Sequence, residues 1–280
     1  MKPLAVMMSV YKNDRLKYLK RSIESILNQT YSDFDFYIQC DGELSNECSI
    51  FLNTLSDKRI ILFKRKENRG LAVSLNELLS IILIKKYNYI ARMDADDICS
   101  TDRFEKQLFF MYKNISIDIL GGNIEEVDEF ENVIGRIIYP TEHNTMKKFF
   151  GKRNPLAHVT VLFRKSYFEK AGYYPINTKS DEDTMFWLKG FINRCTFANI
   201  DDVLVQVRVN PDFYKRRSRF KQNYNEFKNR ISVIKKLDLH FVNYFWVIGR
   251  LIILGLSFAG ITRVAYLYLR KNIQKSPYRT

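Results

Sequence analysis

The chain has 280 residues, of which 46% are hydrophobic and 14% aromatic. This composition excludes a disordered protein and predicts a globular one with a large core. Residues 208–280 carry 16 Lys and Arg against 3 Asp and Glu, whereas residues 1–207 carry 29 against 28, so nearly all of the net charge of +14 belongs to the C-terminal end. A neutral body with a cationic end predicts an anionic partner, either membrane phospholipid or nucleic acid.

Apolar strands and amphipathic helices alternate through the first third of the chain. Strands are expected at residues 4–10, 34–40, 59–63 and 87–93, and helices at 16–28, 45–55 and 71–86. The joints between them are short, and each parallel return needs a crossover helix, so the pattern predicts an α/β fold with a mostly parallel, doubly wound sheet.

This alternation ends near residue 115. A helix at 101–114 is followed by a strand at 117–120 that Gly121 and Gly122 are expected to break, and then by a hairpin at 124–127 and 133–138. Further elements are a helix at 141–150, a strand at 159–164, a helix opened by Asp181, Glu182 and Asp183, and short strands at 196–200 and 203–209.

Acidic residues follow the buried strand at 87–93. Asp94 and Asp96 leave its carboxyl end one residue apart, where open α/β sheets bind ligands, and paired carboxylates suit Mg²⁺ or Mn²⁺. The alternative is an acidic turn that caps the next helix. Thr101 or Asp102 could provide that cap alone, so the acids exceed what a cap requires.

The cysteines and the N-terminus indicate where the protein works. Cys40, Cys48, Cys99 and Cys195 show no paired metal spacing, and the apolar run at 4–10 is too short for a signal peptide. With only three histidines in the chain, no zinc cluster is predicted. We therefore expect a cytosolic protein with reduced thiols.

The C-terminal region differs in composition from the rest, which predicts a boundary between a domain at 1–210 and a helical, basic and apolar extension at 211–280. A basic helix to about residue 237 precedes an apolar region at 241–269, whose longest uncharged run has 12 residues. This is short of the roughly 18–20 residues that a bilayer span needs. The region either lies in the membrane interface or packs as a helical pair on the first domain or on a second subunit; the cationic flank favours the membrane.

Several motifs occur together and in order: Asp41 at a strand end, the Asn68-Arg69-Gly70 turn followed by Asn76, the acids from Asp94 to Asp97, and the Glu182-Asp183 pair. In this set, residues 3–210 resemble the family 2 inverting glycosyltransferases of the GT-A fold, most closely the bacterial branch that builds O-antigen or capsule. The resemblance implies a Rossmann-like central sheet flanked by helices. It also implies a UDP-sugar donor, a Mn²⁺ or Mg²⁺ cofactor, a polyprenyl-diphosphate-linked glycan acceptor, and peripheral location at the cytoplasmic face of the plasma membrane.

The resemblance also implies residue roles. On the donor side, the backbone of Ser9, Val10 and Tyr11 borders the nucleobase, Asp41 accepts from the uracil imide, Arg69 flanks the base, Asp94 serves the ribose or a metal-bound water, and Asp96 binds the metal. Asp41 is followed by Gly42 and Glu43, where many relatives have a second Asp, which departs from the family pattern.

On the acceptor side, the resemblance makes Asp183 the catalytic base. The alternative is that its charge complements the dipole at the N-terminus of its helix, as Asp181 and Glu182 also could. Asn154, Pro155 and His158 match a segment expected near the sugars, although a lone His is often structural. Glu182, Trp187 and Arg208 are further candidates for the acceptor or donor site, with a solvated basic face as the alternative for Arg208.

Two other functions compete with this one. A nucleotidyltransferase would carry a Gly-rich phosphate loop near the N-terminus, and residues 4–14 contain no glycine. A nucleic-acid-binding protein would interleave basic and stacking residues on an exposed face, whereas here a long apolar region follows the basic one. The sequence therefore favours a glycosyltransferase that does not bind nucleic acid.

Overall fold

Strand β1 (Leu4–Tyr11) shows why the sheet forms where the sequence predicts it. Leu4, Val6 and Met8 pack into one hydrophobic cluster, and Ala5 and Met7 pack into another on the opposite face. Successive side chains of a strand point to opposite faces, so a strand that is apolar at every position is stable only when helices cover both sides of the sheet.

The computed structural model describes residues 2–178, 181–209 and 220–256. In its first part, β1 is followed by α1 (Leu16–Leu27), β2 (Phe34–Asp41), α2 (Asn46–Thr54), β3 (Ile60–Lys64), α3 (Leu71–Ile82), β4 (Tyr89–Asp94), β5 (Ile98–Cys99) and α4 (Arg103–Lys113). Then come β6 (Ile119–Val127), β7 (Val133–Ile137), α5 (His143–Phe150), a 3₁₀ turn (His158–Thr160), β8 (Leu162–Arg164), α6 (Lys165–Ala171), α7 (Glu182–Ile192), β9 (Phe197–Arg208), α9 (Phe220–Lys236) and α10 (Val242–Leu256).

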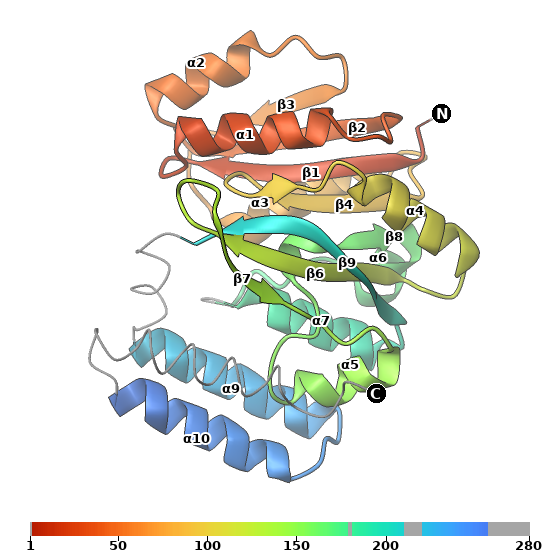
Figure 1. The fold of residues 1–280 in the computed structure, drawn as a ribbon, viewed down its shortest axis with the longest axis vertical. Helices are drawn as coiled ribbons and strands as arrows, with labels where there is room; N and C mark the ends of the chain where they lie inside the picture. Colours follow the sequence, from red (N-terminus) through yellow and green to blue (C-terminus); the bar gives the residue numbers. More distant parts are fainter. Residues whose placement is uncertain (1, 179–180, 210–219, 257–280) are drawn as a thin grey trace.

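The described strands form a nine-stranded sheet in the order β3-β2-β1-β4-β8-β6-β9-β5, with β7 paired to β6 (Figure 1). The pairs β1–β2, β1–β4 and β2–β3 are parallel, as the alternating pattern predicts. β8 runs antiparallel to β4 and β6, and β6 and β7 form the predicted antiparallel hairpin. The sheet is therefore a parallel half joined to a mixed half.

Helices cover the two faces of this sheet. Apolar side chains of α1, α2 and α4 pack on one face, among them Ile23, Leu52 and Phe104. The other face is covered by α3, α5, α6 and α7, through residues such as Leu75 and Phe186. The predicted α/β class with a mostly parallel central sheet is confirmed.

Two details of the predicted β-structure are wrong. Gly121 and Gly122 do not break a strand but lie inside β6, and the two strands expected at 196–200 and 203–209 are one strand, β9, paired to β6. An added Cβ would lie 2.4 Å from Asn199 Oδ1 at Gly121 and 2.5 Å from Leu204 Cδ1 at Gly122. The glycines are therefore required by close packing against β9.

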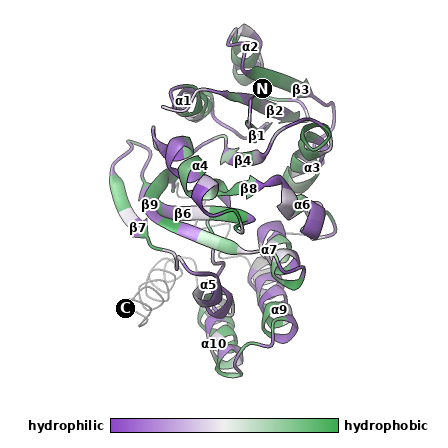
Figure 2. Ribbon diagram, turned by 90° about the vertical axis from the view of Figure 1, so that its right-hand side faces the viewer, coloured by the Kyte–Doolittle hydropathy of each residue, from purple (hydrophilic) through white to green (hydrophobic). Residues whose placement is uncertain are grey.

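The described C-terminal helices pack on the rest of the protein at the end opposite α1 and α2 (Figures 1 and 2). Val233 of α9 and Leu237, the residue after this helix, join the core cluster of α5 and α7. An added Cβ at Gly151, after α5, would lie 2.6 Å from Asn243 Oδ1, so α10 approaches that turn closely. Among the described residues, no helix combines the length and apolar character needed to cross a bilayer. The part of the apolar region beyond residue 256 lies outside the described residues.

Candidate active site

The strand ends that carry the predicted donor-side residues meet at one edge of the sheet. The register pairs Tyr11 with Asp41 and Ser9 with Asp94, and all three strands are parallel. Their carboxyl ends therefore share the edge at which open α/β sheets bind ligands. Val10, between Ser9 and Tyr11, is buried in the core, so only its backbone is available at this edge.

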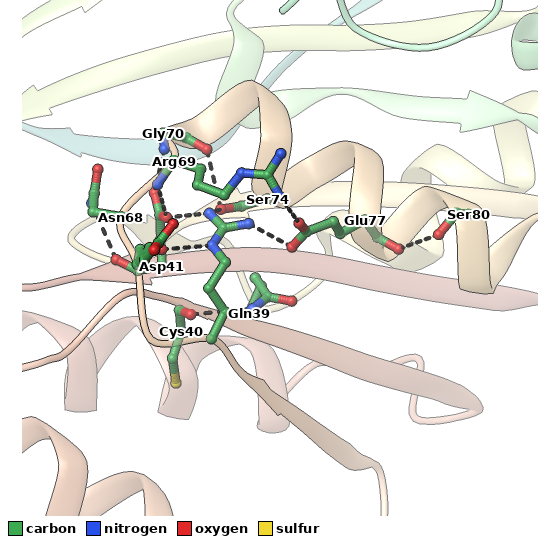
Figure 3. A network of polar contacts seen from close by, with 11 residues as sticks. Gln39, Cys40, Asp41, Asn68, Arg69, Gly70, Ser74, Glu77 and Ser80 are labelled. Carbon is green, nitrogen blue, oxygen red and sulfur yellow. Dashed lines mark hydrogen bonds and ion pairs between the residues drawn. The ribbon is translucent and has the colours of Figure 1, made fainter.

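Asp41 closes the turn that begins α3. Its Oδ1 accepts Arg69 N at 2.8 Å together with a bond from Arg65, and its Oδ2 accepts Gly70 N at 2.9 Å (Figure 3). Gly42 and Gly70 have φ values of +84° and +89°, which favour glycine. An added Cβ on Gly42 would lie 2.7 Å from Asn68 N. The glycine after Asp41 is thus required by the close approach of the 68–70 turn.

Arg65 is a member of this network that the sequence did not single out. It donates to Glu77 Oε2 at 2.5 Å and to Ser74 Oγ at 2.9 Å, as well as to Asp41. Arg69 also donates to Glu77, at 3.3 Å, and its side chain is 57% exposed. In the sequence Arg65 stands between two lysines, so nothing distinguished it from a solvated basic run. Arg69 is thus an exposed cation beside a fixed carboxylate.

The acids after β4 form a crowded group of charges. Asp97 is buried and accepts Arg208 N at 2.8 Å. Burial raises the pKa of Asp97 well above its ordinary value, and the charges of Asp96 and Asp94 add to this effect. Asp14, which follows β1, has a pKa raised to about 7 by burial and by the same two carboxylates, against the lowering effect of its bond from Tyr11 N. The four acids therefore repel one another at the strand edge.

Arg92, on β4, is a further residue next to these acids that was not among the predicted site residues. The residue is 3% exposed, and one of its nitrogen atoms pairs with Asp94 Oδ1. Its Nε and Nη1 have no hydrogen-bond partner in the described structure. An arginine inside an otherwise apolar strand was the available signal, because a charge is rarely buried without a partner.

Arg208 at the end of β9 holds the acidic loop from behind. Its backbone N bonds Asp97, and its Nε donates to Asp96 O at 3.2 Å. Its guanidinium also pairs with Glu131 at 3.2 Å and lies over the ring of Tyr18, 4.2 Å from the centroid. The side chain is 2% exposed. The structure thus places Arg208 where it positions the loop, with its guanidinium turned into protein contacts.

The predicted base lies at the beginning of α7. Asp183 Oδ1 accepts Thr184 N at 2.8 Å, and its Oδ2 accepts Asn154 Nδ2 at 3.0 Å. Asn154 is fixed in turn, because its Oδ1 accepts Thr184 Oγ1 at 2.9 Å and Arg230 Nη2 at 3.0 Å. Burial raises the pKa of Asp183, and the neighbouring charge of Glu182 raises it further. Such a shift makes the carboxylate a stronger proton acceptor.

His158 lies within an aromatic group. Its Nε2 is 2.9 Å from Tyr174 Oη, and its ring is edge-on to Trp187 at 5.5 Å between centroids. Burial lowers the pKa of His158 well below its ordinary value, so the imidazole is neutral. Trp187 is fully buried, so it supports His158 and has no surface for an acceptor.

The donor edge is the edge of the sheet that carries Asp41 and Asp94. It shares one electrostatic environment with the predicted base. The positive charge of Arg92 acts on Asp97, His158 and Asp183. The pKa of Tyr174 is raised by burial; Arg92 opposes this shift, and the charges of Asp183, Glu182 and Asp94 add to it. The structure therefore brings together acids that lie almost ninety positions apart in the sequence.

The acidic loop fits a divalent cation in part. Asp94 and Asp96 are half-buried, supply hard oxygen donors, and raise the pKa of their acidic neighbours by a repulsion that a cation would relieve. In the described part of the chain, no group of three or more His, Cys, Asp or Glu side chains is arranged to hold a metal ion. The fit is therefore to an ion that also takes oxygens from a ligand and from water.

Comparison with known proteins identifies relatives of this chain. The chain is 32% identical over 229 residues to the Escherichia coli UDP-Gal:alpha-D-GlcNAc-diphosphoundecaprenol beta-1,3-galactosyltransferase, covering 80% of each chain. It is also 32% identical over 213 residues to the O-antigen biosynthesis glycosyltransferase WbnJ of Escherichia coli, covering 74% of this chain and 79% of that one.

The fold is likewise shared with solved glycosyltransferases. The mannosyltransferase PcManGT from Pyrobaculum calidifontis, solved in complex with GDP-Man and Mn²⁺, matches with a TM-score of 0.62 at 13% identity, over 99% of this chain and 82% of that one. Residues 5–172 match the family described as Glycosyl transferase family 2. The chain therefore belongs to the family 2 glycosyltransferases and has their GT-A fold.

Proposed function

We propose that this glycosyltransferase is metal-dependent and inverting, and moves a sugar from a UDP-sugar to a polyprenyl-diphosphate-linked glycan in surface polysaccharide biosynthesis. One observation carries the proposal: the acids at the end of β4 and the base at the start of α7 lie within the field of a single buried cation, Arg92. The names of the two Escherichia coli relatives support a UDP-sugar donor, a lipid diphosphate acceptor and a role in O-antigen synthesis.

The donor nucleotide is proposed to lie along the ends of β1 and β2. The backbone of Ser9, Val10 and Tyr11 would border the base, and the exposed Arg69 would flank it. Among the described hydrogen bonds, Asp41 Oδ2 accepts only Gly70 N, which leaves one acceptor position for the uracil imide N–H. Asp41 would thus both hold the turn and recognise the base.

The leaving diphosphate is proposed to lie over the acidic loop. Asp96 and Asp94 would hold Mn²⁺ or Mg²⁺, which when bound would neutralise the charge that develops on the leaving diphosphate. Asp94 is oriented by its pair with Arg92, and its main-chain oxygen accepts Ser22 Oγ at 2.7 Å. Arg208 holds the loop from behind, so the two carboxylates are positioned before the donor arrives.

Asp183 is proposed to take the proton of the acceptor hydroxyl as that oxygen attacks the anomeric carbon. Asn154 and Thr184 N orient the carboxylate, and its raised pKa makes it a stronger base. Attack from the face opposite the leaving group inverts the anomeric centre, so an α-linked donor gives a β-linked product. Glu182 and the neutral His158 would border the sugars.

We further propose peripheral contact with the cytoplasmic face of the plasma membrane through α10. Phe241, the residue before this helix, and Phe245, Ile248 and Ile252 along it form an exposed apolar row, with exposed fractions of 63%, 69%, 44% and 53%. An apolar row beside a basic segment is typical of interfacial helices. Flotation with vesicles that contain phosphatidylglycerol tests this contact: the parent should float, and a Phe245→Ser, Ile248→Ser variant should remain at the bottom.

The reaction is tested by incubating the protein with UDP-galactose, or with other UDP-sugars in turn, and an undecaprenyl-diphosphate-linked sugar, with Mn²⁺ or with EDTA. Free UDP and an extended lipid in the presence of Mn²⁺, and neither with EDTA, support the proposal. In a separate incubation with UTP and a sugar 1-phosphate, release of pyrophosphate would instead indicate a nucleotidyltransferase. Equal turnover with EDTA would contradict the proposed role of the acidic loop.

A further inference from the structure

A pocket between α9, α10 and the turn after α5 has no role in the chemistry described so far. It is a small pocket of about 20 Å³ that opens to solvent, and it is lined by Lys152, Asn223, Glu226, Phe227, Arg230, Val247, Arg250 and Leu251. Three of these side chains are cationic and one is anionic. Since Glu226 pairs with Arg250 at 2.6 Å, the lining side chains alone have an excess of two positive charges, while the carboxylates of Asp181 and Asp183 also act on Arg230.

Two buried hydrogen-bond donors of the pocket residues have no partner in the described structure: Asn223 Nδ2 and Arg230 Nε. Asn223 is 6% exposed and Arg230 is 3% exposed. An unpaired polar group is costly to bury, and an excess of donors together with excess positive charge is the chemistry of an anion site. A phosphate or diphosphate group would supply acceptor oxygens to these donors.

The position of the pocket relative to the base narrows the choice of ligand. Arg230, which lines the pocket, donates through Nη2 to Asn154 Oδ1 at 3.0 Å, and Asn154 donates to Asp183 Oδ2 at 3.0 Å. One side chain therefore separates the pocket from the group that activates the acceptor. The donor edge lies at the carboxyl ends of β1, β2 and β4. The donor's own diphosphate is therefore expected there and not in this pocket.

The pocket also adjoins the apolar row of α10. Val247, Arg250 and Leu251 face the pocket, whereas Phe245, Ile248 and Ile252 are exposed on another side of the same helix. A helix with its side chains is only about 10–12 Å across, so an anion in the pocket lies within one helix diameter of this apolar surface. A ligand that carries a diphosphate on a hydrocarbon chain matches both features.

We infer that this pocket binds the diphosphate of the lipid-linked acceptor, which places the attached sugar beside Asp183. The inference rests on the proposed function, since it names where the acceptor of that reaction is held. Lys152 and Arg250 contact the diphosphate from the pocket mouth, and Arg230 and Asn223 supply donors from its floor. The pocket is an acceptor subsite, separate from the acidic loop that holds the donor.

The test measures binding of farnesyl diphosphate to the full chain in metal-free buffer with excess UDP, so that the donor edge is occupied by UDP. Arg250→Gln and Lys152→Gln should each weaken binding roughly tenfold, as expected for loss of one charge-assisted hydrogen bond. The matched control is Lys58→Gln, which removes the same charge from an exposed turn before β3, and it should bind as the parent does. UDP affinity should be the same in all four proteins.

Equal affinity of the pocket variants and the parent for farnesyl diphosphate would overturn the inference. So would a loss confined to phosphatidylglycerol vesicles, because the pocket would then bind a membrane headgroup. This binding is measured without transfer, so it can succeed where the proposed reaction fails. With an active parent, the same two substitutions should raise the KM for the lipid acceptor and leave the KM for the UDP-sugar unchanged; the reverse pattern would assign the pocket to the donor.

Discussion

The donor edge and the base side of this site are held in different ways. At the donor edge, carboxylates are fixed by backbone N–H groups: Asp41 by Arg69 N and Gly70 N, and Asp97 by Arg208 N. At the base side, Asp183 depends on the side chain of Asn154, which is fixed in turn by Arg230 from α9. The donor edge therefore belongs to the sheet itself, whereas the base requires the C-terminal helices to be in place.

The largest expected effect comes from removing the base. Asp183→Asn keeps the size of the side chain but cannot accept the acceptor's proton, so kcat should fall roughly 10²- to 10⁴-fold. Because the donor edge is held independently, the affinity for UDP with Mn²⁺ should not change, as measured by isothermal titration. If this variant transfers sugar as fast as the parent, Asp183 is not the catalytic base.

A substitution in the acidic loop should lower kcat less than loss of the base does, but it should also weaken UDP binding. Asp96→Asn should lower kcat about 10²- to 10³-fold, since charge stabilisation of the leaving group is weakened. Here the affinity for UDP should also fall, and the gain in affinity that Mn²⁺ gives the parent should disappear. Retention of the full Mn²⁺ effect would show that the ion is held elsewhere.

The dependence of the base on α9 is tested by Arg230→Met and Asn154→Ala. Each should lower kcat about tenfold, the cost of losing one hydrogen bond that orients the base, while UDP affinity remains that of the parent. Asn154→Ala is the second variant because Arg230 also donates to Phe150 O at 2.7 Å and its loss affects packing. A loss of UDP affinity in Asn154→Ala would contradict the separation of the two sides.

The donor edge should respond mainly in stability. Asp41→Asn weakens the bonds to Arg65 and to the 69–70 turn, so the free energy of unfolding should fall by about 1–3 kcal/mol and the KM for the UDP-sugar should rise. The control is Asp202→Asn, which breaks an exposed pair with Lys106 and should cost less than about 1 kcal/mol. Urea unfolding measures both changes in the free energy of unfolding. Equal losses in the two variants would show that Asp41 does not stabilise the turn.

The smallest expected effect is a shift in pH dependence. Asp183 acts as a base only when ionised, so kcat/KM should fall as the pH drops through its raised pKa. Glu182 contributes to that rise by its charge. In Glu182→Gln the pKa of Asp183 should therefore be lower, and the acidic limb of the profile should move to lower pH with kcat at high pH changed only a few-fold. A limb that stays in place would show that Glu182 does not act on the base.

Much of the site's location was predictable because it depends on local patterns. Apolar strands that end in Asp41 and Asp94 place these residues at the carboxyl edge of a parallel sheet, whatever the rest of the chain does. Arg65 and Arg92 were not predictable in the same way. Arg65 donates to Glu77, and the charge of Arg92 acts on Asp183. Both interactions link segments that no periodic pattern connects.

The sequence by itself determined the class of fold and the positions of the acids, because strand and helix periodicity and chain direction are local properties. Only the tertiary structure decided that Gly121 and Gly122 lie within a strand, that α9 joins the core, and that Arg230 reaches Asn154 beside the base. These outcomes depend on which surfaces fit together at close range. Close packing depends on pairs of distant segments, so it cannot be predicted from the sequence of either segment alone.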